Sequence, residues 1–432
     1  MHTNRHALTI LLFVLLLPIG SLAADGAEKR ISLEDYLRAN VASKREIDVF
    51  LHEMSWAQFD PDVGYILGSY MPRDGMDQSS TFSTVQPNGA RTSFMYQGRP
   101  CRINTYGNSF TQCHQVSDGE TWQEYLAAHL GEPVRNFGMG GFGVYQAYRR
   151  MLREEQTKHG AEYVMLYIWG DDHVRSLLRC RYMLTASWNR SQNSKEGKGR
   201  MFHGNFWSNL EMNLTTGQFE EHESRISDPE RLYQMTDPDW MVANLKDDLT
   251  LEMALYSRGQ IHVIDVAKLK ALSRHLNRPL DLDQTPPARA TVASLLDAYS
   301  FAATKAILNK ARAFTDAHDK KLMVILLDPY RVTRTLLEGG TRYDQEIVDF
   351  VRENEFTVFD MNLVHCEDYK SFNLSVGHYF KRYFIGHYNP AGNHLFAYAL
   401  KDRVVNWLDP KPLPYRDTAR KIIDFKEYLQ EY

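Results

Sequence analysis

The sequence predicts an α/β protein built on a parallel β-sheet that is covered by helices. Three short segments, 103–106, 163–169 and 322–327, have the length and apolar content of buried parallel strands. Each is followed by a polar turn, and helical patterns come after the first and the third of them. Two further strands are expected at 134–138 and 356–360. Repeated strand–helix units of this kind indicate a doubly wound sheet of about five strands, with ligands at the carboxyl ends of the strands.

Apolar periodicity places helices before, between and after these strands. The spacing of Ser117 and Glu120 is that of a capping box, and Gly131 is expected to end the helix that follows. Residues 201–226 alternate in polarity around a turn and predict a hairpin. The remaining helices are expected at 31–53 in one or two pieces, after the turn 139–143, and at 238–257, 291–318, 343–353 and 394–407.

The N-terminus has the features of a secretory signal peptide. Arg5 and His6 precede an apolar run over 8–19, and Ser21-Leu-Ala23 is a small-residue cleavage site. The run is short for a membrane span, so we predict a secreted or periplasmic protein with no stable membrane anchor after cleavage; an uncleaved anchor is the alternative. The net charge of −4, with no basic tract, argues against a nucleic-acid partner.

The strand–helix alternation divides the rest of the chain. Residues 24–100 form a helical and then irregular lead-in whose aromatic residues need burial against the main domain. Residues 101–432 form that domain, and the alternation breaks over 174–300, which is expected to be an inserted subdomain at the rim of the active face. Export would permit up to two disulfides among Cys101, Cys113, Cys180 and Cys366, and free buried thiols remain the alternative.

Polar or glycine-rich turns stand at four positions where strands or helices meet. Tyr-Gly-Asn-Ser-Phe-Thr111 presents Ser109 after the first strand, and Asn136-Phe-Gly-Met-Gly-Gly141 follows the second. Trp-Gly-Asp-Asp172 follows the third, and Gly-His-Tyr-Asn-Pro-Ala-Gly392, with His387, comes late in the chain. A serine hydroxyl is a poor nucleophile until a neighbouring base accepts its proton, so Ser109 and His387 are a candidate pair.

In this order the four segments resemble the blocks of the SGNH (GDSL-type) hydrolase family, over roughly residues 100–410 without the insertion. The resemblance implies a three-layer α/β/α sandwich with a flavodoxin-like parallel sheet, and an SGNH-like hydrolase domain over 101–432. It implies Ser109 as the nucleophile and His387 as the general base. The oxyanion hole would comprise the amides of Ser109 and Gly141, with Gly140 as the alternative to the latter, and the side chain at Asp171.

The sequence departs from the family at three positions. Asn108 replaces the aspartate of the first block and retains a hydrogen-bonding side chain. Asp171 stands where an asparagine donates to the oxyanion, and an ionised carboxylate cannot donate; a lost donor costs about 100- to 1000-fold in turnover. Phe384-Ile385 replaces the aspartate that would orient the histidine. Asp172, Asp328 or a backbone carbonyl are the candidates to replace it.

These observations predict a secreted serine esterase that hydrolyses or transfers an O-acyl group of a small molecule or polysaccharide, with no cofactor. No metal is expected, because Asp171, Asp172 and His173 are adjacent on a turn and cannot easily converge on one ion. The alternative is a catalytically degenerate carbohydrate-binding protein. Aromatic and basic residues of the insertion suit sugar rings and carboxylates, or else form its small core: Trp188, Phe202, Phe206, Trp207, Trp240, Arg175, Arg179, Arg181 and Arg190.

Overall fold

The computed structural model describes residues 30–53, 55–186, 204–278 and 287–416. The described residues from Ile31 onward form one compact unit. The predicted signal peptide, residues 1–23, lies outside the described residues, as do Trp188, Arg190 and Phe202 of the predicted insertion. No helix among the described residues has the length and apolar content needed to cross a membrane.

The core is a five-stranded sheet in which every neighbouring pair of strands is parallel, which confirms the predicted α/β class. The spatial order is β4-β3-β5-β8-β9, so the second strand of the sheet along the chain lies outside the first, as in doubly wound sheets of order 2-1-3-4-5. The strands are β3 (Ile103–Tyr106), β4 (Val134–Asn136), β5 (Tyr163–Ile168), β8 (Lys321–Leu326) and β9 (Thr357–Asp360).

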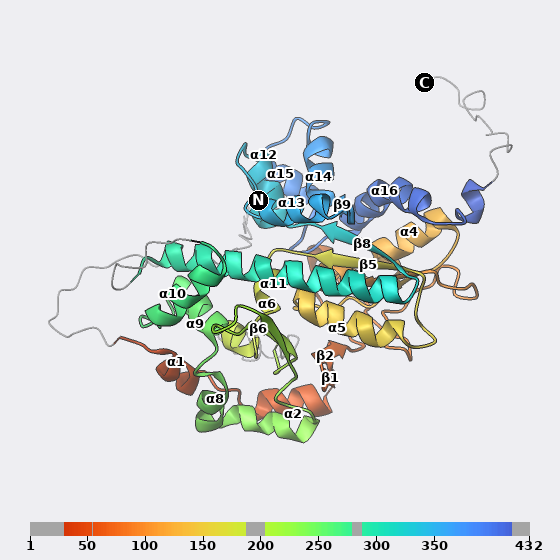
Figure 1. Ribbon diagram of the computed structural model, residues 1–432. Coiled ribbons are helices and arrows are strands. Elements are labelled where there is room, and N and C mark those ends of the chain that lie inside the picture. Colours follow the sequence, from red (N-terminus) through yellow and green to blue (C-terminus); the bar gives the residue numbers. More distant parts are fainter. Residues whose placement is uncertain (1–29, 54, 187–203, 279–286, 417–432) are drawn as a thin grey trace, which may run out of the picture. The chain divides into compact units, whose positions relative to one another are not determined.

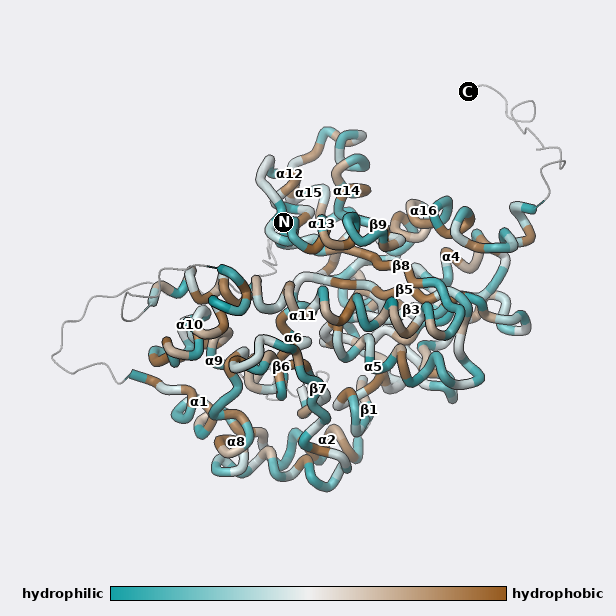
Figure 2. Tube along the Cα trace, in the orientation of Figure 1, coloured by the Kyte–Doolittle hydropathy of each residue, from teal (hydrophilic) through white to brown (hydrophobic). Residues whose placement is uncertain are grey.

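Helices pack on both faces of this sheet, and successive residues of β5 alternate between two apolar cores. Tyr163, Met165 and Tyr167 pack with α4 (Trp122–Leu130) and α16 (Pro390–Trp407). Val164, Leu166 and Ile168 pack with α5 (Val144–Glu155) and α11 (Arg289–Ala317). Figure 1 shows these two helix pairs on opposite sides of the strands, and Figure 2 shows the apolar colour along β5 and β8 between them. Burial on both faces explains why β5, and β8 after Lys321, are continuous apolar runs.

The lead-in and the segment between β5 and β8 share the second of these cores. Leu37 and Phe50 of the lead-in are buried in it, as are Phe206 and Trp207 of the predicted insertion. The predicted boundary at residue 300 falls inside α11, which packs against the sheet. The other elements are α1 (Leu33–Ala39), α2 (Lys44–His52), β1 (Ala57–Asp60), β2 (Gly64–Leu67), η1 (Met76–Gln78), α3 (Ser109–Gln112), η2 (Asp118–Glu120), α6 (Asp172–Arg175), β6 (Asn209–Met212), β7 (Phe219–His222), η3 (Pro229–Thr236), α8 (Pro238–Leu245), α9 (Leu249–Ser257), α10 (Val266–His275), η4 (Pro329–Thr333), α12 (Arg334–Leu337), α13 (Gln345–Glu353), α14 (Met361–Tyr369), α15 (Val376–Tyr383) and η5 (Leu413–Tyr415).

Two helix predictions were wrong, one at an interior break and one at its first residue. The expected helix 238–257 is two helices, α8 and α9, because Asp248 caps a new helix by accepting a hydrogen bond from the amide of Leu251 at 2.9 Å. The last helix begins at Pro390, not at His394, because Asn389 accepts from the amide of Gly392 at 2.9 Å and so caps it. All four cysteines lie within the described residues and are free thiols.

Candidate active site

Ser109 lies directly beyond the carboxyl end of β3, at the first position of α3. Gly107 makes the turn with φ +152°, and a Cβ at this position would lie 2.8 Å from the carbonyl oxygen of Tyr167. Asn108 then caps α3, since its side-chain oxygen accepts a hydrogen bond from the amide of Phe110 at 2.7 Å. The strand end, the glycine and the cap together fix where the Ser109 hydroxyl emerges.

His387 reaches the same point from the other end of the chain. Its Nε2 lies 2.7 Å from the Ser109 hydroxyl oxygen, although 278 positions separate the two residues. The imidazole packs against the rings of Phe110 and His114, with centroid separations of 5.0 and 5.1 Å. The structure therefore brings together the two side chains that the sequence identified as nucleophile and base.

The residue that orients His387 is Gln115, which the sequence analysis missed. Its side-chain oxygen accepts from the backbone amide of His387 at 2.9 Å and lies 3.0 Å from the ring Nδ1. The amide nitrogen of Gln115 donates to the carbonyl oxygen of Asp74 at 3.1 Å, so the oxygen is the end that faces the imidazole. An amide oxygen only accepts, so Nδ1 carries the proton and Nε2 presents its lone pair to Ser109.

His387 is therefore neutral and has the tautomer that a general base requires. Burial holds the pKa of His387 well below its usual value, and the charges of His114 and Arg175 lower it further. Burial also lowers the pKa of His114, against the opposing effect of Asp74. His114 is held by the Tyr70 hydroxyl at 3.0 Å from Nδ1 and by the Asp74 carboxylate at 3.2 Å from Nε2.

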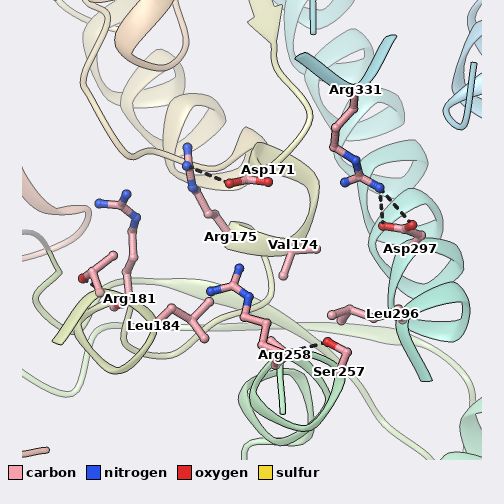
Figure 3. A pocket seen from close by; sticks show the side chains of 13 residues that line it. Asp171, Val174, Arg175, Arg181, Leu184, Ser257, Arg258, Leu296, Asp297 and Arg331 are labelled. Carbon is pink, nitrogen blue, oxygen red and sulfur yellow. Dashed lines mark hydrogen bonds and ion pairs between the residues drawn. The ribbon is translucent and has the colours of Figure 1, made fainter. Parts of the chain in front are cut away.

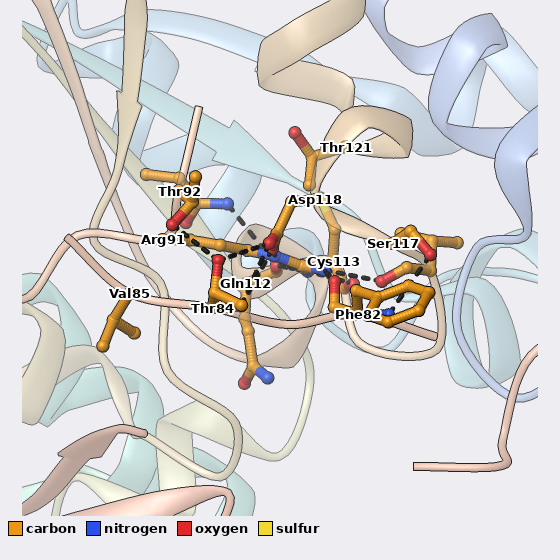
Figure 4. A network of polar contacts seen from close by, with 12 residues as sticks. Phe82, Thr84, Val85, Arg91, Thr92, Gln112, Cys113, Ser117, Asp118 and Thr121 are labelled. Atoms are coloured by element: carbon orange, nitrogen blue, oxygen red, sulfur yellow. Dashed lines mark hydrogen bonds and ion pairs between the residues drawn. The ribbon is translucent and has the colours of Figure 1, made fainter. Parts of the chain in front are cut away.

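A buried arginine of the lead-in holds the loop that bears Gln115. Arg91 is 2% exposed and pairs with the Asp118 carboxylate at 2.8 Å. Its guanidinium also donates to the carbonyl oxygens of Gln112 and Cys113, at 2.6 Å each, and of Val116 at 2.5 Å (Figure 4). Because Gln115 has a left-handed backbone, with φ +72°, these contacts stabilise a loop conformation that is otherwise unfavourable.

The serine side of the site has a separate buried support. Asn108 donates a short hydrogen bond from its side-chain nitrogen to Asp172. The same carboxylate accepts from the amide of Trp169 at 2.8 Å and pairs with Arg175 at 3.1 Å. Burial raises the pKa of Asp172 to about 7, while Arg175, Asn108 and the Trp169 amide oppose the rise.

Neither carboxylate expected to orient His387 hydrogen-bonds its ring. Asp172 is occupied beneath Asn108, as described above. Asp328 caps the turn η4, accepting from the amides of Tyr330 and Arg331 at 3.1 and 2.9 Å, and burial raises the pKa of Asp328 to about 6. The group that contacts Nδ1 of His387 is therefore the neutral side chain of Gln115, and not an aspartate or a backbone carbonyl.

The expected oxyanion groups differ in their availability. The Gly140 amide donates to the Gln112 side chain at 2.7 Å, which removes Gly140 as the alternative donor. Among the described residues, the amides of Ser109 and Gly141 donate no hydrogen bond. Gly141 has φ +85°, and a Cβ there would lie 2.4 Å from Nη1 of Arg181 and 2.6 Å from the Tyr65 hydroxyl oxygen. A residue other than glycine is thus excluded at this point.

Asp171 faces solvent more than its neighbour Asp172, which lies buried against Asn108. Its side chain is 46% exposed and pairs with Arg175 at 3.3 Å, whereas that of Asp172 is 2% exposed. Asp171 and Arg175 line a pocket of about 250 Å³ with residues of the segment between β5 and β8 (Figure 3). The carboxylate that was expected in the oxyanion hole is thus paired with a guanidinium.

The insertion residues proposed for ligand binding have divided roles. Phe206 and Trp207 are buried in the core, and Trp240 packs on Phe206 with ring centroids 5.1 Å apart, so these aromatics serve the core. Arg179 pairs with Glu211 and Asp247. Arg175 and Arg181 line the pocket of Figure 3.

The described residues contain no cluster of three or more histidine, cysteine or carboxylate side chains arranged to hold a metal ion. His173, which follows Asp172, is buried and bonds the Thr304 hydroxyl at 2.8 Å through Nδ1. Compared with models of known protein families and with curated proteins, the sequence matches none of them.

Proposed function

We propose that this protein is a serine esterase of the SGNH type, which hydrolyses an O-acyl ester or transfers its acyl group to another hydroxyl. The observation that carries the proposal is the 2.7 Å contact between the Ser109 hydroxyl and Nε2 of His387, with Nδ1 oriented by Gln115. A nucleophile, a base and a group that orients the base are the elements that acyl transfer through a serine requires.

In the first step Nε2 of His387 accepts the proton of the Ser109 hydroxyl while its oxygen attacks the ester carbonyl. The oxyanion that forms would receive hydrogen bonds from the amides of Ser109 and Gly141, which are uncommitted among the described residues. The imidazolium then returns the proton to the leaving alcohol, and the acyl-enzyme is released to water or to an acceptor hydroxyl through the same base.

Gln115 would stabilise the imidazolium less than a carboxylate does, because its oxygen carries only a partial charge. It still fixes the tautomer and the ring orientation, which are the roles of the third member of a serine triad. The acyl substrate is proposed to belong to a carbohydrate or another alcohol-bearing molecule outside the cell, following the signal peptide that the sequence predicts.

Hydrolysis of p-nitrophenyl acetate tests the proposal. We expect steady turnover by the purified protein and a loss of about 10⁴-fold or more in kcat/KM for both Ser109→Ala and His387→Ala. Ser371→Ala and His378→Ala are matched controls, because both residues are exposed and neither hydrogen-bonds the Ser109–His387 dyad. Circular dichroism of each variant verifies that the fold is intact.

The two controls should retain the activity of the unaltered protein. Activity that survives in Ser109→Ala would contradict the proposal. Complete absence of turnover on aryl, alkyl and sugar acetates, together with binding of oligosaccharides, would favour the carbohydrate-binding alternative, in which Asp171 at an oxyanion position reflects a lost activity.

A further inference from the structure

The pocket that Asp171 and Arg175 line is rich in guanidinium groups. Its wall contains four arginines, Arg175, Arg181, Arg258 and Arg331, and two carboxylates. Figure 3 shows these side chains around one space, with α6, α9 and α11 contributing to its wall. The volume of about 250 Å³ is below the roughly 300–1,000 Å³ of pockets for drug-sized ligands, so it suits one charged group or sugar unit.

Two of the arginines are already neutralised by acidic neighbours. Arg175 pairs with Asp171 at 3.3 Å and with Asp172, outside the pocket wall, at 3.1 Å. Arg331 pairs with Asp297 at 3.1 Å and stacks on Tyr343 with its guanidinium 3.6 Å from the ring centre. Arg175 and Arg331 therefore hold the pocket wall in place and add little net positive charge to the pocket.

The other two arginines leave the pocket with an excess of positive charge. Nη1 of Arg181 is buried and forms no hydrogen bond of normal geometry with a described residue, although it lies beside the Tyr65 hydroxyl. Arg258 follows the last turn of α9, is exposed, and pairs with no carboxylate among the described residues. Neither guanidinium pairs with a carboxylate among the described residues, and a guanidinium without a partner charge is well suited to bind an anion.

We infer that this pocket binds an oxyanionic group, a carboxylate, phosphate or sulfate, that belongs to the acylated substrate, with Arg181 and Arg258 as its principal contacts. The planar guanidinium forks of two arginines match the paired oxygens of such groups. The inference rests on the proposed function for the identity of the acyl substrate, and it narrows that substrate from any ester to an anionic one.

Two arginines of the pocket wall also contact groups that support or adjoin Ser109. Arg175 lines the pocket, pairs with the Asp172 carboxylate that supports Asn108, and its charge lowers the pKa of His387. Arg181 lies against Gly141, whose amide is a proposed oxyanion donor. An anionic group in the pocket would therefore hold an ester on an adjacent atom or sugar unit near Ser109.

Binding and turnover can be measured separately. Trigalacturonate, neutral galactotriose and inorganic phosphate are titrated by calorimetry into the Ser109→Ala protein, and acetylated forms of the two sugars are assayed as substrates of the active protein. We expect trigalacturonate to bind more tightly than galactotriose, and more weakly as salt is raised. Arg258→Gln should weaken trigalacturonate binding and raise KM for its acetylated form about 10-fold, with little effect on the neutral sugar.

Arg403→Gln is the matched control, because it removes the same charge from an exposed position on α16, away from the pocket wall. Equal binding of the charged and neutral sugars, or equal effects of Arg258→Gln and Arg403→Gln, would overturn the anion site even if esters are hydrolysed. Salt-sensitive, Arg258-dependent binding without any turnover would support the site and reject the esterase. Inorganic phosphate that binds as tightly as trigalacturonate would overturn the assignment to a substrate group.

Discussion

The two halves of the dyad have supports of different chemistry. Beneath Ser109, Asn108 is held by Asp172, a buried carboxylate with a pKa raised to about 7 by its burial. Behind His387, Gln115 is a neutral amide that is itself held by the carbonyl oxygen of Asp74. The group that holds Asn108 therefore titrates near neutral pH, whereas the amide that orients His387 does not titrate.

In a serine triad with an aspartate, one residue both orients the histidine and carries a negative charge. In this protein, the orientation of the histidine and the titrating charge belong to different residues, Gln115 and Asp172. The histidine side fixes tautomer and orientation without a charge, so the base should function over a broad pH range. The serine side carries the charge, and the effect of pH should therefore be found in the stability of the turn. Replacements at Gln115, Asp172 and Asp171 test this separation.

Replacement of Gln115 should have the largest effect. Gln115→Ala removes the acceptor of two hydrogen bonds from His387 and should lower kcat/KM for p-nitrophenyl acetate about 100-fold. Gln115→Glu keeps the acceptor and adds a negative charge, which favours the imidazolium and raises the pKa of His387. Its kcat/KM should therefore fall at a higher pH on the acidic side than that of the unaltered protein.

The pH–rate profile distinguishes orientation from mere packing at Gln115. If Gln115 only filled space, Gln115→Glu and the unaltered protein would have the same acidic limb. Identical limbs would mean that the contact between the side chain of Gln115 and Nδ1 of His387 has no role in the reaction.

Asp172→Asn should alter stability in a pH-dependent way. The folded state holds the Asp172 proton up to about pH 7, whereas an ordinary aspartate loses it near pH 4. Stability from this group is thus fully present below the unfolded pKa and is lost as the pH rises through the folded pKa. Between pH 5 and pH 8 the unfolding free energy should fall in the unaltered protein by about 2 kcal/mol more than it falls in Asp172→Asn.

Urea unfolding at the two pH values measures that difference. Each protein is compared with itself at the two pH values, so any loss of stability that Asp172→Asn causes equally at both pH values cancels. A parallel fall in both proteins would mean that Asp172 is ionised throughout this range, and that the contrast between the two supports is not one of titration.

Asp171→Asn should have the smallest effect of the three. Asp171 is half exposed, and its pair with Arg175 is of the kind worth roughly 0–1 kcal/mol. We expect stability to change by less than about 1 kcal/mol and turnover of p-nitrophenyl acetate to change little. A loss as large as that of Gln115→Ala would put Asp171 in contact with the reacting groups.

The serine side and the sheet were predictable from the sequence because their signals are local. β5, and β8 from Met323 to Leu326, are buried on both faces and so are apolar. Gly107, Asn108 and Ser109 are consecutive residues at a strand end. His387 was found from its glycine and Asn-Pro-Ala-Gly surroundings. The assignment to an SGNH type stays a prediction, as do the export and the substrate.

Gln115 could not be predicted, because nothing in its own segment indicates its role. It points at His387 only because its backbone is left-handed, because Arg91 holds the loop, and because Asp74 accepts from its side chain. These contacts join the lead-in, the loop that bears Gln115 and the segment of His387. The lead-in was expected only to pack on the main domain, but its residues Asp74 and Arg91 both hold this loop.

Reaction with a fluorophosphonate, followed by intact mass and peptide mapping, shows whether His387 activates the Ser109 hydroxyl. We expect one phosphonyl adduct, on Ser109, which is absent in Ser109→Ala, formed far more slowly in His387→Ala, and slowed about 100-fold in Gln115→Ala. An adduct on another residue, or labelling of Ser109 at an unchanged rate in His387→Ala, would contradict this activation.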